Sequence, residues 1–109
     1  MADNPVRAYG PAQPGTTNAT LYTVPGATEF IMRHIRIVNT TGSAATITLA
    51  VAGSSDTAAN HILSALSIPK NAVYDWTGFL VLEASETIQG KQGTSSALTV
   101  TISGVQVTP

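Results

Sequence analysis

Apolar and polar residues alternate along most of the chain, in short runs separated by turn residues. In Thr46–Val51, Ile47, Leu49 and Val51 share one face and hydroxyl side chains fill the other. A period of two places alternate side chains on opposite faces of a β-strand. Turn signals about every 8–12 positions are typical of a β-sandwich or β-barrel. The pattern therefore predicts an all-β domain.

The runs predict about eight strands and no helix longer than a turn. The expected strands are Thr20–Val24, Glu29–Asn39, Thr46–Val51, Asn60–Ile68, Ala72–Trp76, Phe79–Glu83, Thr87–Gln89 and a last one that begins at Leu98. Within Glu29–Asn39, apolar residues occupy both phases, which favours either a bulge or a strand covered on both faces. The strand count predicts an antiparallel two-sheet β-sandwich of the jelly-roll type.

The first 18 residues differ in texture, with three prolines, two glycines and few apolar side chains. Proline removes a backbone donor and fixes φ, so we expect residues 1–18 to form an extended arm without a core of its own. The sandwich domain then spans residues 19–109. We expect the arm to order against a neighbouring subunit. Its candidate contact residues are Pro5, Arg7, Tyr9 and Pro11.

Charge and cysteine content exclude several classes of function. Only 10% of the 109 residues are charged and the net charge is −1, so there is no basic footprint for nucleic acid or an anionic membrane. The chain has no cysteine, which excludes disulfides and thiol chemistry. No apolar stretch is long enough to span a bilayer, and the N-terminus lacks the features of a signal peptide. A hydroxyl-rich, nearly neutral surface favours association with other protein.

Residues that could carry chemistry do not form a recognisable site. His34 and His61 lack metal-ligand spacing, so we expect no metal and no cofactor. Glu83 and Glu86 flank a tight turn, where solvated acids are ordinary. No Gly-x-Ser-x-Gly elbow occurs, and the segment 90–94 lacks the Gly-Lys-[Ser/Thr] ending of a phosphate loop. We therefore expect that the protein is not an enzyme.

Two groups of residues are candidates for binding. Arg33 and Arg36 lie on a strand that is otherwise rich in isoleucine. Arginine is favoured at interfaces because it binds carboxylates and aromatic rings of the other subunit, so this strand is a candidate subunit interface. Its contact residues would be Phe30, Met32, Arg33 and Arg36. Tyr74 and Trp76 share one strand phase beside Asp75, and exposed aromatics next to an acid can stack on sugars. The other interpretation of Trp76 is a residue that caps the core or lies in a subunit contact.

The order of several segments resembles small structural proteins of tailed bacteriophages. The resemblance covers about residues 20–107 and is carried by Leu21-Tyr22-Thr23-Val24-Pro25, Ile35-Arg36-Ile37-Val38-Asn39-Thr40-Thr41, Thr46-Ile47-Thr48-Leu49-Ala50-Val51, Ile62-Leu63, Leu66-Ser67-Ile68-Pro69, Phe79-Leu80-Val81-Leu82-Glu83-Ala84-Ser85-Glu86-Thr87-Ile88 and Leu98-Thr99-Val100-Thr101-Ile102-Ser103-Gly104-Val105. The family usually has Gly-Asp where this chain has Ser85-Glu86, which leaves the turn type open. The resemblance implies a virion component, either capsid decoration (cement) or a tail or fibre part, and no catalytic residues.

Two hypotheses of function follow. The first is a capsid decoration protein that bridges subunits of the major capsid protein, self-associates as a homotrimer, and lies on the capsid surface of the virion after synthesis in the host bacterial cytoplasm. The second is a tail, baseplate or fibre module that recognises a host glycan through Tyr74, Asp75, Trp76 and the loop 90–96.

Overall fold

The computed structural model describes residues 2–53 and 60–108, which form eight strands. The strands are β1 (Ala2–Ala12), β2 (Ala19–Thr23), β3 (Glu29–Asn39), β4 (Ala45–Gly53), β5 (His61–Ile68), β6 (Val73–Leu82), β7 (Thr87–Gln92) and β8 (Leu98–Thr108). Within these ranges no helix is long and apolar enough to cross a membrane. The all-β prediction is therefore confirmed.

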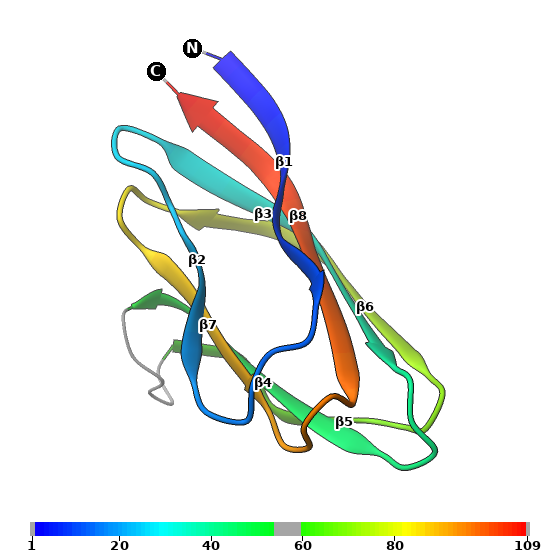
Figure 1. Cartoon of the computed structure of the whole chain (residues 1–109). Helices are drawn as coiled ribbons and strands as arrows, with labels where there is room; N and C mark the ends of the chain where they lie inside the picture. The colour runs from blue at the N-terminus through cyan, green and yellow to red at the C-terminus, as the bar shows by residue number, and fades with distance from the viewer. Residues whose placement is uncertain (1, 54–59, 109) are drawn as a thin grey trace.

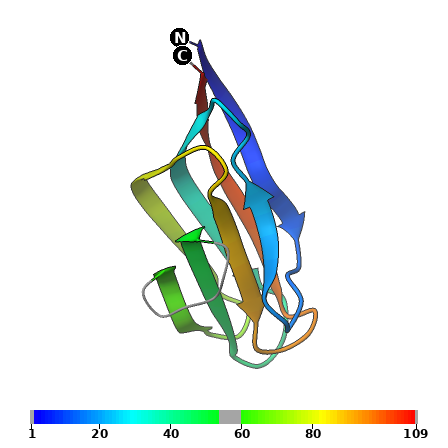
Figure 2. The same cartoon turned by 90° about the vertical axis from the view of Figure 1, so that its left-hand side faces the viewer.

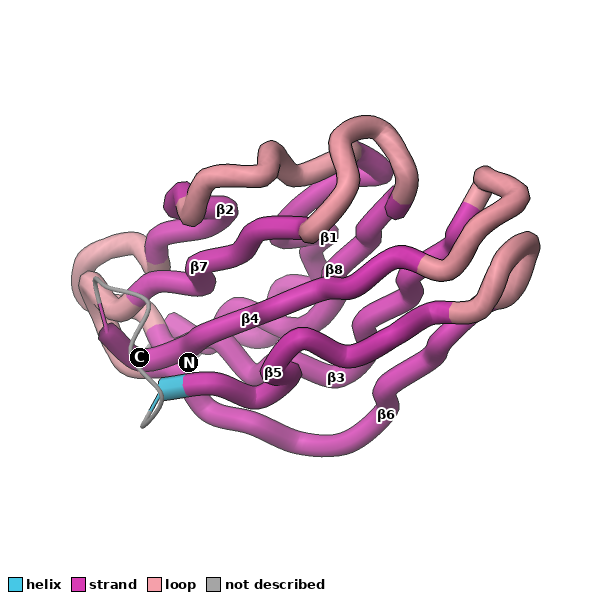
Figure 3. Tube along the Cα trace, turned by 90° about the horizontal axis from the view of Figure 1, so that it is seen from below, coloured by secondary structure: helices cyan, strands magenta, loops and turns pink. Residues whose placement is uncertain are grey.

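The strands form two antiparallel four-stranded sheets packed face to face (Figures 1 and 3). The first sheet has the order β1-β8-β3-β6 and the second the order β2-β7-β4-β5. Strands pair from the chain ends inward, β1 with β8, β2 with β7, β3 with β6 and β4 with β5. This arrangement is an eight-stranded jelly roll, as the sequence predicts. The molecule is 46 Å long, and both termini lie at one end (Figure 2).

The core lies between the sheets and is built from the inward phase of each strand. On β8, Leu98, Val100 and Ile102 are fully buried, while the residues between them lie on the opposite face. The phenyl ring of Phe30 fills the core near the termini and lies 5.0 Å from the ring of Tyr22, centroid to centroid. Period-two alternation thus produces the core directly.

A register shift in β3 explains why apolar residues occupy both of its phases. Between Met32 and His34 the pairing slips against both β6 and β8. Before the slip Phe30 and Met32 point inward, and after it Ile35 and Ile37 do. A bulge of one residue reverses which face each later side chain occupies. Of the two alternatives left open by the sequence, the bulge is the correct one.

The N-terminal segment is extended, as expected, but it is a strand of the sandwich and not a free arm. β1 pairs with β8 from Ala2 opposite Thr108 to Ala12 opposite Val100. Side chains of β1 also cover the core, among them Val6 and Tyr9. The proline-rich sequence is compatible with this place because an edge strand needs donors on one side only. The first sheet would lose an edge without residues 2–12, so residue 18 does not mark the start of the folded unit.

The segments 72–76 and 79–83 are one strand, β6, and not the two that the sequence predicts. The chain passes through Thr77 and Gly78 without a turn, and the register slips there against β3. Gly78 leaves room for the indole of Trp76 at this point, since a Cβ on it would lie 3.1 Å from that ring. The expected flexible loop at 90–96 is also shorter, since residues 90–92 belong to β7.

Candidate contact surface

The first sheet presents a complete strand face to the outside of the molecule. We call the outer face those residues of β1, β8, β3 and β6 that point away from the second sheet. Across it, the register aligns Pro5 with Val105, Val105 with Ile31, and Ile31 with Val81. One apolar row therefore crosses all four strands. Pro5 and Val81 are exposed, and Val105 and Ile31 are half-buried.

The apolar row is extended by the most exposed large hydrophobic residue of the described chain. Phe79 follows the slip in β6 and is 66% exposed, and its neighbour Val81 is 44% exposed. Val73, at the other end of the same strand, is 51% exposed. Exposed apolar groups that gather in one place mark interaction sites more often than isolated ones do. All three lie on β6, so the apolar character of the outer face is concentrated at that edge.

An ionic cluster lies on the same face, beside the apolar row. Asp75 accepts hydrogen bonds from Arg36 Nε at 2.9 Å and Nη2 at 3.3 Å. The Nε2 atom of His34 lies 2.9 Å from Oδ1 of Asp75, the oxygen that also accepts from Arg36 Nε. The hydrogen bonds from Arg36 and then His34 lower the pKa of Asp75, and Asp75 in turn raises the pKa of Arg36. The single carboxylate is thereby held by the guanidinium of Arg36 and the imidazole of His34.

Arg33 lies at the slip in β3 and reaches the neighbouring strand. Its Nε donates to the carbonyl oxygen of Gly78 at 3.1 Å, which joins the irregular points of β3 and β6. Because the phase changes here, Arg33 and His34 are adjacent in sequence and neither points into the core. The bulge thus places an exposed guanidinium at Gly78, the residue before Phe79.

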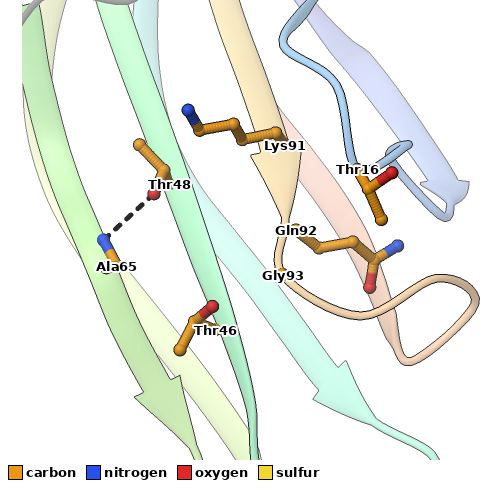
Figure 4. A pocket seen from close by; sticks show the side chains of 7 residues that line it. All are labelled: Thr16, Thr46, Thr48, Ala65, Lys91, Gln92 and Gly93. Atoms are coloured by element: carbon orange, nitrogen blue, oxygen red, sulfur yellow. Dashed lines mark hydrogen bonds between the residues drawn. The ribbon is translucent and has the colours of Figure 1, made fainter.

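A small pocket lies on the other sheet, between β4, β5, β7 and the loop that follows β1 (Figure 4). It has a volume of about 270 Å³ and is lined by Thr16, Thr46, Thr48, Ala65, Lys91, Gln92 and Gly93. Two of its polar side chains are engaged within the chain: Thr48 accepts the amide of Ala65 at 3.0 Å, and Gln92 donates to the carbonyl oxygen of Pro14 and accepts the amide of Leu98. In residues 2–53 and 60–108 no three metal-ligating side chains gather. The outer face is therefore the stronger candidate for a functional site.

The structure divides the predicted interface residues into two groups. Pro5 and Arg7 lie on the outer face with Arg33 and Arg36. Phe30 and Met32 were expected in the contact, but both are 0% exposed and belong to the core. That prediction is wrong because the slip after Met32 reverses the phase of the strand. Ile31 occupies the outward position between them.

Two further predicted contact residues lie near the end of β1. Tyr9 packs against the core from the edge, and partial burial raises the pKa of its hydroxyl. Pro11 is exposed. Neither belongs to the apolar row, so the contact candidates on β1 are its earlier residues.

The predicted sugar-stacking group does not share one surface. Tyr74 and Trp76 pack against the core from β6, while Asp75 between them points to the outer face and binds Arg36. Successive side chains of a strand point to opposite sides, so no platform combines both aromatics with the acid. The interpretation of Trp76 as a residue that caps the core agrees with this packing.

Sequence reasoning missed the aromatic side chain that is most exposed. Phe79 and Val81 lie in a run of four apolar residues, 79–82, which the sequence predicts as a strand without saying which face is covered. In an edge strand such a run cannot be buried on both sides by one chain. The available signal was therefore the excess of apolar residues over what one core face requires.

No known family model matches the chain, and no characterised protein matches its sequence. Solved structures of viruses contain chains that are similar to this one. A chain in the structure of infectious bursal disease virus, Gx strain, has a TM-score of 0.51 and 12% identity over 98% of this chain. This chain covers 32% of that one, about a third of its length. A chain of the cyanophage Pam1 capsid asymmetric unit has a TM-score of 0.35 and 18% identity over 98% of this chain and 82% of that one. The first of these similarities shows a shared β-sandwich fold.

Proposed function

We propose that the protein is a structural component of a virus particle, and specifically a capsid decoration (cement) protein that bridges subunits of the major capsid protein. The observation that carries this proposal is the apolar row across the outer face, which ends at Val81 and the exposed Phe79. Such a face suits a broad contact with protein, whereas a small substrate needs a concave site. The fold shared with a chain of infectious bursal disease virus supports the same class.

The mechanism would be adhesive. A rigid β-sandwich that touches two neighbouring subunits adds buried area which must be exposed again before the subunits separate. Specific interfaces bury on the order of 1,600 Å² in total, so one sheet face of a protein this small is a reasonable share of such a contact. Arg33 and Arg7 would meet carboxylates at the border of the apolar row. The unit that binds would be a homotrimer.

Copy number in purified particles tests the proposal. Decoration requires the protein in a high and fixed ratio to the major capsid protein, which quantitative mass spectrometry measures. Rebinding to particles stripped of the protein then tests the surface: Phe79→Glu should reduce binding at least tenfold and leave the fold intact, because the side chain is 66% exposed. Ser67→Glu, an exposed position on the other sheet, is the matched control. A handful of copies per particle, or full binding by Phe79→Glu, would contradict the proposal.

A further inference from the structure

The edge of β6 has the composition of an interior strand. On its outer side Val73, Phe79 and Val81 are exposed, and on its inner side Trp76 and its neighbours Tyr74 and Leu80 are only partly buried. A strand that is apolar on both sides is normally covered on both sides and paired at both edges. β6 pairs with β3 alone, and its second edge has no partner among the described strands.

The other sheet edges are protected against pairing. β1 contains Pro5 and Pro11 and has two register shifts against β8. β2 is five residues long and ends just before Val24-Pro25. β5 has two register shifts against β4 and a residue of positive φ, Ala65, at 48°. Prolines, short strands and irregular pairing are the usual means of preventing edge-to-edge association. β6 is ten residues long and has no proline, and its pairing with β3 has one register shift, between Thr77 and Leu80, where β1 and β5 each have two.

We propose that β6 pairs in antiparallel orientation with β6 of a second copy, about a two-fold axis at Thr77. This pairing would join the first sheets of the two copies into one eight-stranded sheet. This inference goes beyond the proposed function and does not depend on it. It is distinct from a trimer contact, since β1 and most of the outer face stay free.

The sequence of β6 is complementary to itself in this register. When Thr77 lies opposite Thr77 of the second copy, Trp76 lies opposite Gly78 of that copy, so a large ring faces a residue without a side chain. Tyr74 lies opposite Leu80 and Val73 opposite Val81. Aromatic–aliphatic and β-branched pairs stabilise neighbouring strands, and aromatic cover of an edge glycine is a recognised device. All pairs except the one between Asp75 and Phe79 join like with like or large with small.

Charge does not oppose the pairing. Asp75 is the one charged side chain of β6, and its carboxylate is bound by Arg36 and His34 of its own subunit. Two copies of the edge therefore meet without an uncompensated charge on either strand. This agrees with a chain whose net charge is only −1.

The area also fits a reversible dimer. Edge pairing buries the backbone edge of β6 and the flanks of the side chains that lie opposite each other, while the outward sides of Phe79, Val73 and Val81 stay exposed on the joined sheet. The contact is therefore smaller than the roughly 1,200 Å² at which standard specific interfaces begin, and belongs with weak, transient contacts. We therefore expect association at micromolar concentration, not an obligate dimer.

Because the chain contains no cysteine, single cysteines can report the register directly. Residues directly opposite each other in antiparallel strands have Cα atoms about 4.5–5.5 Å apart, within the range that a disulfide spans. Thr77→Cys should therefore form a disulfide-linked dimer under mild oxidation. Phe79→Cys is the matched control. Position 79 is strongly exposed, but residue 79 of the second copy would lie four residues further along the opposite strand, about 14 Å away.

Sedimentation of the unmodified chain gives the second test. The mass should rise from 11.2 kDa toward twice that value between about 1 and 200 µM. Val81→Lys should weaken association at least tenfold while circular dichroism and the urea midpoint stay unchanged, since lysine at an exposed edge position opposes pairing. A monomer at 200 µM, a trimer without Thr77 crosslinking, or equal crosslinking of both cysteine variants would overturn the inference. None of these results bears on copy number in particles.

Discussion

Gly104 allows β8 and β3 to lie close together above the ring of Phe30, and replacing it by alanine should be strongly destabilising. It is buried on the inward phase of β8, opposite Met32 on β3 and Val6 on β1. A Cβ at this position would lie 2.2 Å from the carbonyl oxygen of Ile31 and 2.6 Å from Cζ of Phe30. The phenyl ring can move, but the carbonyl belongs to the backbone of the paired strand. The two strands must therefore separate locally.

The size of the effect follows from these contacts. Overpacking a core costs about 1–3 kcal/mol. Weakening one or two ladder hydrogen bonds adds about 1 kcal/mol each. Alanine also lowers the conformational entropy of the unfolded chain, which stabilises the folded state by about 0.4–1 kcal/mol. Gly104→Ala should therefore lower the free energy of unfolding by about 2–4 kcal/mol, a large part of the 5–15 kcal/mol typical of a domain.

Urea unfolding followed by the fluorescence of Trp76, the single tryptophan, measures this change. Gly42→Ala is the matched control, because a Cβ there meets nothing within 4 Å. A second control shrinks the ring: in a Phe30→Leu background, Gly104→Ala should cost at least about 1 kcal/mol less than in the native chain. If Gly104→Ala and Gly42→Ala unfold within about 1 kcal/mol of each other, the steric reasoning is refuted.

Three further changes test other parts of the structure. Gln92→Ala should cost about 2–4 kcal/mol and increase hydrogen exchange at the amide of Leu98, because Gln92 is 1% exposed and its Oε1 accepts that amide at 2.8 Å; unchanged exchange would contradict this. Asp75→Asn should make the free energy of unfolding less dependent on pH below pH 4. The pKa of Asp75 is lowered in the folded state, so its contribution to the free energy of unfolding is present above the ordinary pKa of 3.8 and is lost as pH falls through the lower folded pKa. Urea midpoints of the native chain and the variant at pH 7, 4 and 2.5 measure this difference. Deleting residues 2–12 should remove cooperative unfolding, since β8 would keep β3 but lose its partner on the other side and the core would lose the cover of Val6 and Tyr9; a folded truncated domain would instead support the free-arm interpretation.

The alternation of side chains predicted most of the sandwich because each strand has one face in the core. The segment Glu29–Asn39 was predicted with the observed bounds, and Thr46–Val51 lies within β4. Alternation failed at β1, an edge strand that covers little of the core. Such a strand needs few apolar residues and tolerates proline, so it resembles a disordered segment by composition. Its partner, β8, is far away in sequence: the pair with the smallest separation, Ala12 and Val100, is 88 residues apart, which is beyond what a local pattern can show.

The contact residues were harder to predict because one slip changes their faces. Ile31, Ile35 and Ile37 share one phase of a regular strand in the sequence, and Phe30 and Met32 share the other. In the structure the slip after Met32 divides the strand, so Ile31 points outward and the later isoleucines point inward. Sequence alone allowed a bulge but did not locate it. A pattern of period two identifies the face of a strand only as far as the next irregularity.

The outer face also has no linear motif, because its four strands are the first, eighth, third and sixth along the chain. A jelly roll that pairs from the ends inward distributes any surface of this sheet over the whole sequence. What remains visible is an excess: β6 carries more apolar residues than one core face can cover, and three of them are exposed. In a chain with only 10% charged residues, the surface has few charges to oppose another protein at that edge. The excess on β6 is therefore the one feature of the sequence that points to the proposed pairing of two copies, and the low charge leaves little to repel a second copy there.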